Sequence, residues 1–271
     1  MSLCDYELRR GKTTSKISHK MLSYTVVLAL LCVAATASIG FSNCLNVFAS
    51  GFIPDEPSGA KQICRDGKIA ISYDVPMIDP AWSAYFITYD EASSEIPGRL
   101  SFYEDPDLQS LGVTQASVDS DAFNNSWNRG HLAPSHILSH TMDSKKATYT
   151  MANIAPQEGT FNQQTWNHFE TDVFDWIVAN KKSLYIVTGV AYHSRSSPRR
   201  TYDNIAVPDY YWKVICDLDG GRSAGFYGHN DHDGIIDTFY SVKDVEAIYG
   251  GALLPSACNT DTVNPTHWWS F

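Results

Sequence analysis

The chain contains 271 residues, of which 44% are hydrophobic and 18% are charged, a composition typical of a globular protein with an apolar core. This composition excludes a disordered or low-complexity chain, and the sequence contains no internal repeat. The formal net charge of −10 argues against a protein that holds nucleic acid through a broad cationic surface. It still allows an enzyme that contacts a few phosphates through a metal ion and one or two arginines.

Residues 1–37 are predicted to be a signal peptide with a long N-terminal region. The apolar run from Met21 to Ala37 ends in Ala-Thr-Ala, a small-x-small cleavage signal, and lysines precede the run. Cleavage would make the protein secreted and extracellular, without stable membrane association. Met21 is an alternative start that would give a signal peptide of more ordinary length. An uncleaved signal anchor is the other alternative, because the apolar stretch can be extended to Phe41.

Four cysteines follow the predicted cleavage site: Cys44, Cys64, Cys216 and Cys258. An even number in an oxidising compartment predicts disulfides, and four cysteines allow three pairings. We favour Cys44–Cys64 with Cys216–Cys258, because each bond would pin a terminal segment that otherwise frays. Residues 38–66 are therefore interpreted as a disulfide-pinned N-terminal segment, and residues 67–271 as the main domain.

Strands and helices are interspersed along the main domain. The patterns predict, in chain order, a hairpin of strands at 68–75 and 81–89, helical character at 141–151, a clear helix at 162–180, a buried strand at 183–190, a strand pair at 209–216 and 222–227, and a short helix at 242–250. Residues 99–106 connect elements, and residues 117–127 are predicted to be a polar loop. The order contains no repeating βαβ unit, which favours an α+β fold over a doubly wound parallel sheet.

Side chains suited to chemistry on phosphates are concentrated between residues 128 and 170. The segment reads Asn128-Arg129-Gly130-His131, then Asn153-Ile154-Ala155-Pro156-Gln157, then Asn162-Gln163-Gln164-Thr165-Trp166, and it closes on Glu170. A histidine with a pKa near neutrality can take a proton from water. Arg129 lies two residues before His131, so an extended chain places both on one side, where the arginine can hold a phosphate oxygen.

The residues that follow are suited to a hard cation. Asn162 offers a neutral oxygen of the kind Mg²⁺ accepts, and Glu170 lies about two helical turns further on, on roughly the same side of the helix. The carboxylate could hold a water on that ion. The structural alternatives are that Asn162 caps the helix and that Glu170 is a surface carboxylate. The basic pair Lys145-Lys146 is expected to be solvated loop charge.

These motifs resemble those of the DNA/RNA non-specific endonucleases, the ββα-metal nucleases that include secreted bacterial nucleases and mitochondrial endonuclease G. The hallmark of the family is Asp-Arg-Gly-His followed by Asn-x-x-Pro-Gln, by Asn-Gln-x-x-Trp and by a glutamate. The match is specific over about 45 residues, and the segment from Cys44 to Cys64 resembles the secreted animal branch. The resemblance implies a ββα-metal (His-Me finger) fold with a central, mainly antiparallel sheet flanked by helices. It also implies that residues 67–271 form the endonuclease domain.

The resemblance implies a role for each matching residue. His131 is the expected general base, and Asn162 is the expected sole protein ligand of one Mg²⁺, for which Mn²⁺ can substitute. Glu170 is expected to orient a water on that ion, and Arg129 to contact phosphate. Asn153 is expected to support the site through a hydrogen bond near His131.

Arg99 resembles the family's second phosphate arginine, although its spacing to Asp105-Pro106 is one residue longer than usual. The implied activity is endonucleolytic hydrolysis that leaves 5′-phosphates. DNA is the expected substrate. RNA is a second one, because the chemistry does not need the 2′-hydroxyl. Groups that engage only the phosphate give little base specificity.

Asn128 is the clear departure from the family pattern, which usually has Asp at this position. The change keeps the hydrogen-bonding shape and loses the charge, and we expect activity to be retained. The main alternative is a catalytically inactive relative that binds nucleic acid or protein. A zinc enzyme is a weaker alternative, which rests on the helical ligand spacing of His136 and His140.

Overall fold

The computed structural model describes residues 40–125, 127–234 and 236–261. The predicted signal peptide lies outside these residues. The part described is built on a seven-stranded sheet in the order β1-β2-β3-β6-β9-β10-β11. These strands are β1 (Lys61–Arg65), β2 (Ile69–Asp74), β3 (Asp79–Ile87), β6 (Leu184–Ala191), β9 (Tyr210–Asp217), β10 (Arg222–His229) and β11 (Ile236–Tyr240).

Every neighbouring pair in this sheet is antiparallel. The predicted hairpin is present as β2 and β3, the buried strand as β6, and the strand pair as β9 and β10. β1 lies within residues 38–66 and forms one edge of the sheet. The α+β prediction with a mainly antiparallel sheet is therefore confirmed.

The helices are short, with one exception. They are α3 (Tyr89–Ala92), α4 (Pro106–Ser110), α5 (Asp121–Asn125), α6 (Met142–Thr148), α7 (Asn167–Asn180) and α8 (Val242–Tyr249), with 3-10 turns η1 (Leu45–Val47), η2 (Ala49–Gly51), η3 (Met151–Asn153) and η5 (Ser256–Cys258). α5 falls in the stretch predicted to be a loop. α8 ends at Gly250, whose left-handed φ of 87° a residue with a side chain rarely adopts. No helix in the described ranges is long and apolar enough to cross a membrane.

The helix predicted at 162–180 is two pieces. A π-helical turn, η4 (Phe161–Trp166), precedes α7. The alternative in which Asn162 caps this helix is wrong, because Asn162 lies inside the π turn. The Glu158 carboxylate accepts a hydrogen bond from the Phe161 amide at 2.8 Å at the start of the turn. Single π turns are uncommon and frequently occur at functional sites.

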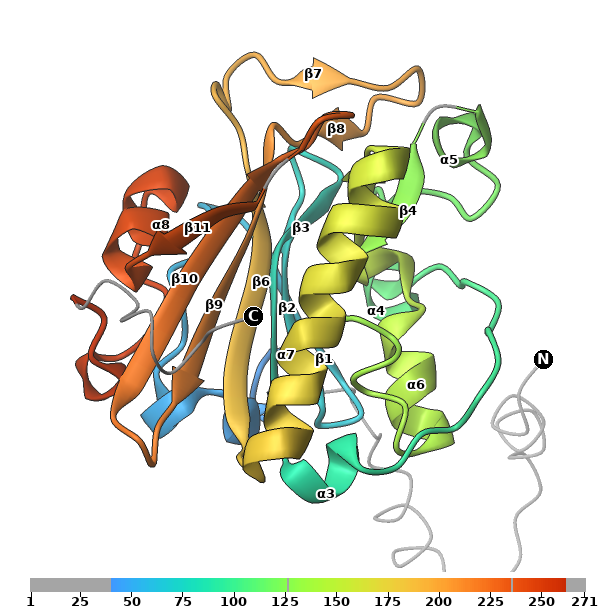
Figure 1. The fold of residues 1–271 in the computed structure, drawn as a ribbon. Coiled ribbons are helices and arrows are strands. Elements are labelled where there is room, and N and C mark those ends of the chain that lie inside the picture. The colour runs from blue at the N-terminus through green and yellow to red at the C-terminus, as the bar shows by residue number, and fades with distance from the viewer. Residues whose placement is uncertain (1–39, 126, 235, 262–271) are drawn as a thin grey trace, which may run out of the picture. The chain divides into compact units, whose positions relative to one another are not determined.

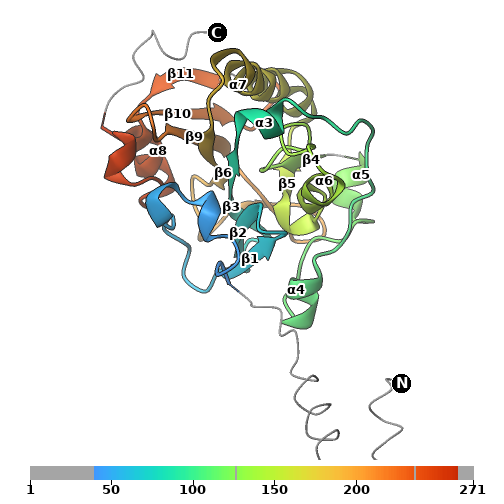
Figure 2. The ribbon, with the colours of Figure 1, turned by 90° about the horizontal axis from the view of Figure 1, so that it is seen from below.

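Alternation along the strands divides the core between the two faces of the sheet. One face, with Ile186, Tyr211 and Ile215, packs against α7 and the segment around residues 132–155. The other face, with Trp82, Trp212 and the cysteines of both disulfides, packs against α8 and the N-terminal turns. Figures 1 and 2 show α7 and α8 on opposite sides of the sheet.

Both predicted disulfides are present. Cys44 bonds to Cys64, and Cys216 bonds to Cys258. The first bond joins the N-terminal turns to the edge strand β1, and the second joins the end of β9 to η5. Each bond therefore ties a terminal segment to the sheet, as the sequence predicts.

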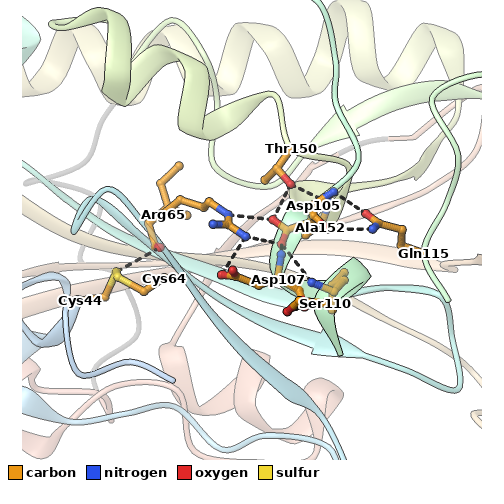
Figure 3. A network of polar contacts seen from close by, with 11 residues as sticks. Cys44, Cys64, Arg65, Asp105, Asp107, Ser110, Gln115, Thr150 and Ala152 are labelled. Atoms are coloured by element: carbon orange, nitrogen blue, oxygen red, sulfur yellow. Dashed lines mark hydrogen bonds and ion pairs between the residues drawn. A yellow bond between two sulfur atoms is a disulfide. The ribbon is translucent and has the colours of Figure 1, made fainter. Parts of the chain in front are cut away.

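A buried carboxylate, Asp105, joins β1, the start of α4 and the residue before η3 (Figure 3). Its Oδ2 accepts hydrogen bonds from Arg65 Nε and from Thr150 Oγ1, both at 2.7 Å. Its Oδ1 pairs with the Arg65 guanidinium and accepts from the backbone amides of Asp107 and Leu108, so that it caps α4. Thr150 directly precedes η3. The network therefore fixes the start of the turn that carries Asn153.

Candidate functional site

A two-stranded ribbon carries the first motif. β4 (Asn128–His131) pairs antiparallel with β5 (Ile154–Gln157). Gly130 is required at its centre, because a Cβ there would lie 2.5 Å from Gln157 Oε1 and 2.7 Å from Tyr211 Oη. The ribbon therefore packs closely on the sheet, and Tyr211 secures it by donating a hydrogen bond to the Ala155 carbonyl at 2.9 Å.

Strand alternation separates the side chains of the first motif. Arg129 and His131 project to one face of β4, and Asn128 projects to the other. Asn128 is paired with Gln157 in the ribbon register. The position at which this chain departs from the family pattern is therefore on the face of the strand opposite the imidazole, although Asn128 lines a cleft together with Arg129.

His131 lies in an apolar surrounding. Its ring packs against Phe102 and Tyr149, with centroids 5.3 Å from each. Nε2 is buried without a hydrogen-bond partner among the described residues. Burial, together with the nearby positive charge of Arg99, lowers the pKa of His131 to about 3. The sequence indicated a value near neutrality. The lower value keeps the imidazole neutral at physiological pH.

This lowered pKa predicts a pH-dependent loss of stability. The unfolded chain binds a proton at His131 below about pH 6.5, whereas the folded protein does not until about pH 3. The stability due to His131 is therefore complete above pH 6.5 and falls as the pH drops, by at most roughly 1.4 kcal/mol per pH unit. Urea unfolding of wild type and His131→Asn from pH 7.5 to 4.5 measures it. We expect wild type to lose more stability than the variant, and parallel curves would contradict the prediction.

Arg129 is held in place by aromatic rings. Its guanidinium lies 5.4 Å from the centroid of Phe102 and 5.3 Å from that of Phe123. Nη2 donates to the Val118 carbonyl at 2.6 Å, and Nε is buried with no partner among the described residues. Burial and the charge of Arg99 lower the pKa of Arg129. The two arginines are therefore near enough to repel each other, an arrangement that favours an anion between them.

Two adjoining clefts bring the predicted residues together. One, of about 250 Å³, is lined by His131, Asn162 and Glu170 among others. The second, of about 540 Å³, is lined by Arg99, Arg129 and Asn128 among others. Asn162 and Asn167 line both clefts. The site is therefore continuous from the imidazole to the two arginines, with the Asn162 amide between them.

Asn153 lines neither cleft and supports the site from the protein interior. It is fully buried, and its amide makes four hydrogen bonds. Oδ1 accepts from Ser83 Oγ at 2.7 Å and from the Ala133 amide at 3.0 Å, while Nδ2 donates to the carbonyls of Ala133 and Thr148, both at 2.9 Å. The predicted bond near His131 is thus made to Ala133, two residues further on. Asn153 fixes the backbone that leaves β4.

Glu170 is not a surface carboxylate, because it is only 6% exposed. Its Oε1 lies 3.3 Å from the ammonium of Lys213, which is fully buried in β9. The sequence analysis did not identify Lys213. Its signal is a lysine inside an apolar strand, in the run Tyr-Tyr-Trp-Lys-Val-Ile-Cys. A lysine at such a position needs a buried anionic or polar partner.

Lys145 is a second cation that the sequence analysis misjudged. It is not solvated loop charge, because it is only 3% exposed, lines the smaller cleft and donates a hydrogen bond to the Ile96 carbonyl. α6 places it there, with Thr141 as its N-cap. Lys145 therefore fixes the segment that leads to Arg99, and it adds positive charge beside the smaller cleft.

The donor set of the clefts fits a hard divalent cation. Asn162 lines both clefts and has an amide oxygen to offer, and Glu170 adds one carboxylate to the smaller cleft. Mg²⁺ suits so sparse a set, because it keeps most of its waters. In the described part of the chain, no group of three His, Cys, Asp or Glu side chains could hold a metal. Residues 134–140, where helical spacing suggested a zinc pair, form turns.

Comparison with known proteins agrees with this geometry. A family model described as DNA/RNA non-specific endonuclease matches residues 52–262. The chain belongs to this family. In structure, it is similar to a chain of the EndoG/EndoGI complex, with a TM-score of 0.60, 21% identity, and coverage of 78% of this chain and 91% of that one. The ββα-metal fold implied by the motifs is therefore confirmed.

Two relatives show how much of the chain is shared. A nuclease of Nostoc sp. is 34% identical over 97 residues, which cover 36% of this chain and 34% of the relative. The endonuclease domain-containing 1 protein of Homo sapiens is 31% identical over 147 residues, which cover 52% of this chain and 27% of the relative. The matches span about a third or less of these two relatives, so the likeness concerns the shared domain.

Proposed function

We propose that the protein is a secreted, metal-dependent endonuclease that hydrolyses phosphodiester bonds of DNA, and of RNA as a second substrate, without sequence specificity. One observation carries the proposal. His131, Asn162 and Glu170 line a single cleft, and Asn162 also lines the adjoining cleft with Arg99 and Arg129. A base, an oxygen ligand and two phosphate-binding cations thus surround one space. Secretion is supported by the N-terminal apolar run and the two disulfides.

In this mechanism His131 is the general base. Its neutral imidazole takes a proton from the attacking water at Nδ1, since Nε2 is enclosed. Arg129, fixed between two aromatic rings, donates to a non-bridging oxygen of the scissile phosphate, where negative charge builds up in the transition state. Arg99 is more exposed and holds the same or the neighbouring phosphate.

Asn162 and Glu170 form the cation side of the site. Asn162 would hold a divalent cation, Mg²⁺ or Mn²⁺, which when bound would stabilise the leaving 3′ oxygen. Departure of that oxygen leaves a 5′-phosphate on the other product. Glu170 orients water on this side of the cleft through the oxygen that Lys213 does not engage. The groups described contact phosphate and water rather than bases, which accounts for the proposed lack of sequence specificity.

The test is incubation of purified protein with supercoiled plasmid in Mg²⁺, in Mn²⁺ and in EDTA. We expect relaxed and then linear DNA with either metal and no cleavage in EDTA. Asn162→Ala should shift the metal requirement to higher concentration, and end-labelling of the products should find 5′-phosphates. Absence of cleavage with retained DNA binding would overturn the proposal in favour of an inactive binding relative.

Asn128→Asp is expected to leave plasmid nicking within about tenfold of wild type, a smaller change than loss of a general base causes. Asn128 is on the face of β4 opposite His131, so its charge state acts on the imidazole only from a distance. The comparison is made in saturating Mg²⁺ at pH 7.5. An inactive wild type beside an active Asn128→Asp would contradict the prediction and show that the departure from the family pattern abolished activity.

A further inference from the structure

Three polar side chains lie in register across the middle of the sheet. Ser83 of β3 pairs with Thr188 of β6, and Thr188 pairs with Lys213 of β9. All three are completely buried on the face that packs against α7. Such a row is costly in an apolar layer unless each member has a partner. Its two ends do have partners, and both partners belong to the motifs of the site.

At one end, Ser83 donates its hydroxyl hydrogen to Asn153, which fixes the backbone after His131. At the other end, Lys213 holds Glu170. The row therefore connects the sheet to both arms of the site, the β4–β5 ribbon and α7. The sequence shows the row as single polar residues in the apolar strands Ala-Trp-Ser-Ala-Tyr, Ile-Val-Thr-Gly-Val and Trp-Lys-Val-Ile.

The ammonium of Lys213 has no spare hydrogen. Its Nζ donates to Thr188 Oγ1 at 2.7 Å, to Tyr85 Oη at 3.3 Å and to Glu170 Oε1 at 3.3 Å. It also lies 5.4 Å from the centre of the Trp166 ring. Three donors meet three acceptors, so the charge is fixed in one place. A fixed charge can fix the orientation of the carboxylate paired with it.

Glu170 is the only acidic partner among these contacts. It is nearly buried, and one oxygen is engaged by Lys213 while the residue still lines the cleft with His131 and Asn162. A hydrogen bond to one oxygen of a carboxylate restricts the orientation of the other oxygen. The buried ammonium supplies that restraint from behind, and the other oxygen is left for the cleft.

We infer that Lys213 is a positioning residue for Glu170: it holds Oε1 from the core of the sheet so that Oε2 faces the cleft and can orient water there. The inference rests on the proposed nuclease function, because that function gives Glu170 its task. It goes beyond that function by assigning a role in catalysis to a residue that does not line either cleft.

The first test is kinetic and uses a short single-stranded DNA at saturating Mg²⁺. Lys213→Met is expected to lower kcat by at least 30-fold, close to the loss in Glu170→Gln, with KM changed by less than threefold. The double variant should be no slower than the slower single variant, because both substitutions remove the same ion pair between Lys213 and Glu170. Additive losses, or a kcat of Lys213→Met within threefold of wild type, would overturn the inference.

Arg222→Met is the matched control. Arg222 pairs with a different buried carboxylate, Asp217, at the far end of β9, at 2.9 Å. It therefore tests what loss of a cation beside a buried carboxylate does by itself. We expect Arg222→Met to be less stable than wild type while kcat stays within threefold. An equal fall of kcat in Arg222→Met and Lys213→Met would mean that Lys213 serves stability alone, against the inference.

The second test needs no activity. Urea midpoints are measured without metal for wild type, Lys213→Met, Glu170→Gln and the double variant. The loss caused by Lys213→Met should be smaller when Glu170 is already Gln, because no carboxylate is then left unpaired. Equal losses in both backgrounds would contradict the pairing. This cycle of four proteins remains informative if wild type proves inactive. Failure of the proposed nuclease function can therefore be distinguished from failure of the inferred pairing of Lys213 with Glu170.

If Lys213→Met does not fold, Lys213→Gln replaces it in both tests. Glutamine keeps a polar group for Thr188, but it is shorter than lysine and uncharged, so it removes the charge that is paired with Glu170. We expect its kcat to be at least tenfold below that of wild type. A folded Lys213→Gln with wild-type kcat would overturn the inference.

Discussion

His131→Ala is expected to reduce the rate of plasmid nicking by roughly 10²–10⁴-fold, the range associated with loss of a general base. In the proposed mechanism the remaining groups still hold the phosphate, so DNA binding in Mg²⁺ should be nearly unchanged. In the proposed mechanism Nδ1 of His131 takes the proton, and the two described clefts are lined by no other histidine apart from His136. The measurement is initial nicking rate against protein concentration, with binding followed separately by fluorescence anisotropy.

The control for this substitution is His229→Ala, which removes an exposed imidazole at the end of β10, outside the residues that line the two clefts. It should nick at the wild-type rate. Near-UV circular dichroism checks that His131→Ala keeps the packing of Phe102 and Tyr149, against which the imidazole lies. A folded His131→Ala that nicks within threefold of wild type would show that another group takes the proton.

Asn153→Ala is expected to lower the free energy of unfolding by roughly 3–5 kcal/mol, because it leaves several buried polar groups without partners. These are the hydroxyl of Ser83, both backbone groups of Ala133 and the carbonyl of Thr148. The backbone after His131 should also shift, so the nicking rate should fall even for the folded fraction. Urea unfolding measures the first effect, and nicking at 10 °C, normalised to the folded fraction, measures the second.

Asn180→Ala is the matched control for Asn153→Ala. Asn180 makes a single exposed bond to the Trp176 carbonyl at the end of α7. Its loss should change the free energy of unfolding by less than about 0.5 kcal/mol, as is usual at exposed positions. Similar losses in Asn153→Ala and Asn180→Ala would contradict the importance given to the buried network.

The sequence predicts most of the strands, because their signals are local. Alternating apolar residues define β2, the turn at 76–80 and the aromatic-rich run after it define β3, and the apolar run that ends in Gly189 defines β6. The disulfide pairing is also correct, since each bond joins a terminal segment to the sheet. These features depend on periodicity and on the ends of the chain, which are visible without tertiary information.

The features that the sequence could not predict depend on contacts distant along the chain. The π turn at 161–166 is stabilised by packing of Phe161 and Trp166 on Tyr211, 45 residues further along from Trp166. Lys213 is buried because α7 covers the face of the sheet on which it lies. The lowered pKa of His131 requires Phe102 and Tyr149 around the ring. Motif resemblance names the residues of the site, whereas these surroundings decide their protonation and orientation.

The two faces of the sheet differ in what they carry: one holds disulfide cysteines, and the other faces the helix that contributes to the clefts. The disulfide cysteines Cys44, Cys216 and Cys258 belong to the layer on the α8 side, whereas Glu170 lies on the face covered by α7. The layer on the α8 side contributes no side chain to either cleft, so it can be redesigned for stability. Substitutions among Val214, Val242 and Leu253 of that layer are expected to change the stability of the protein and to leave the residues that line the clefts unchanged.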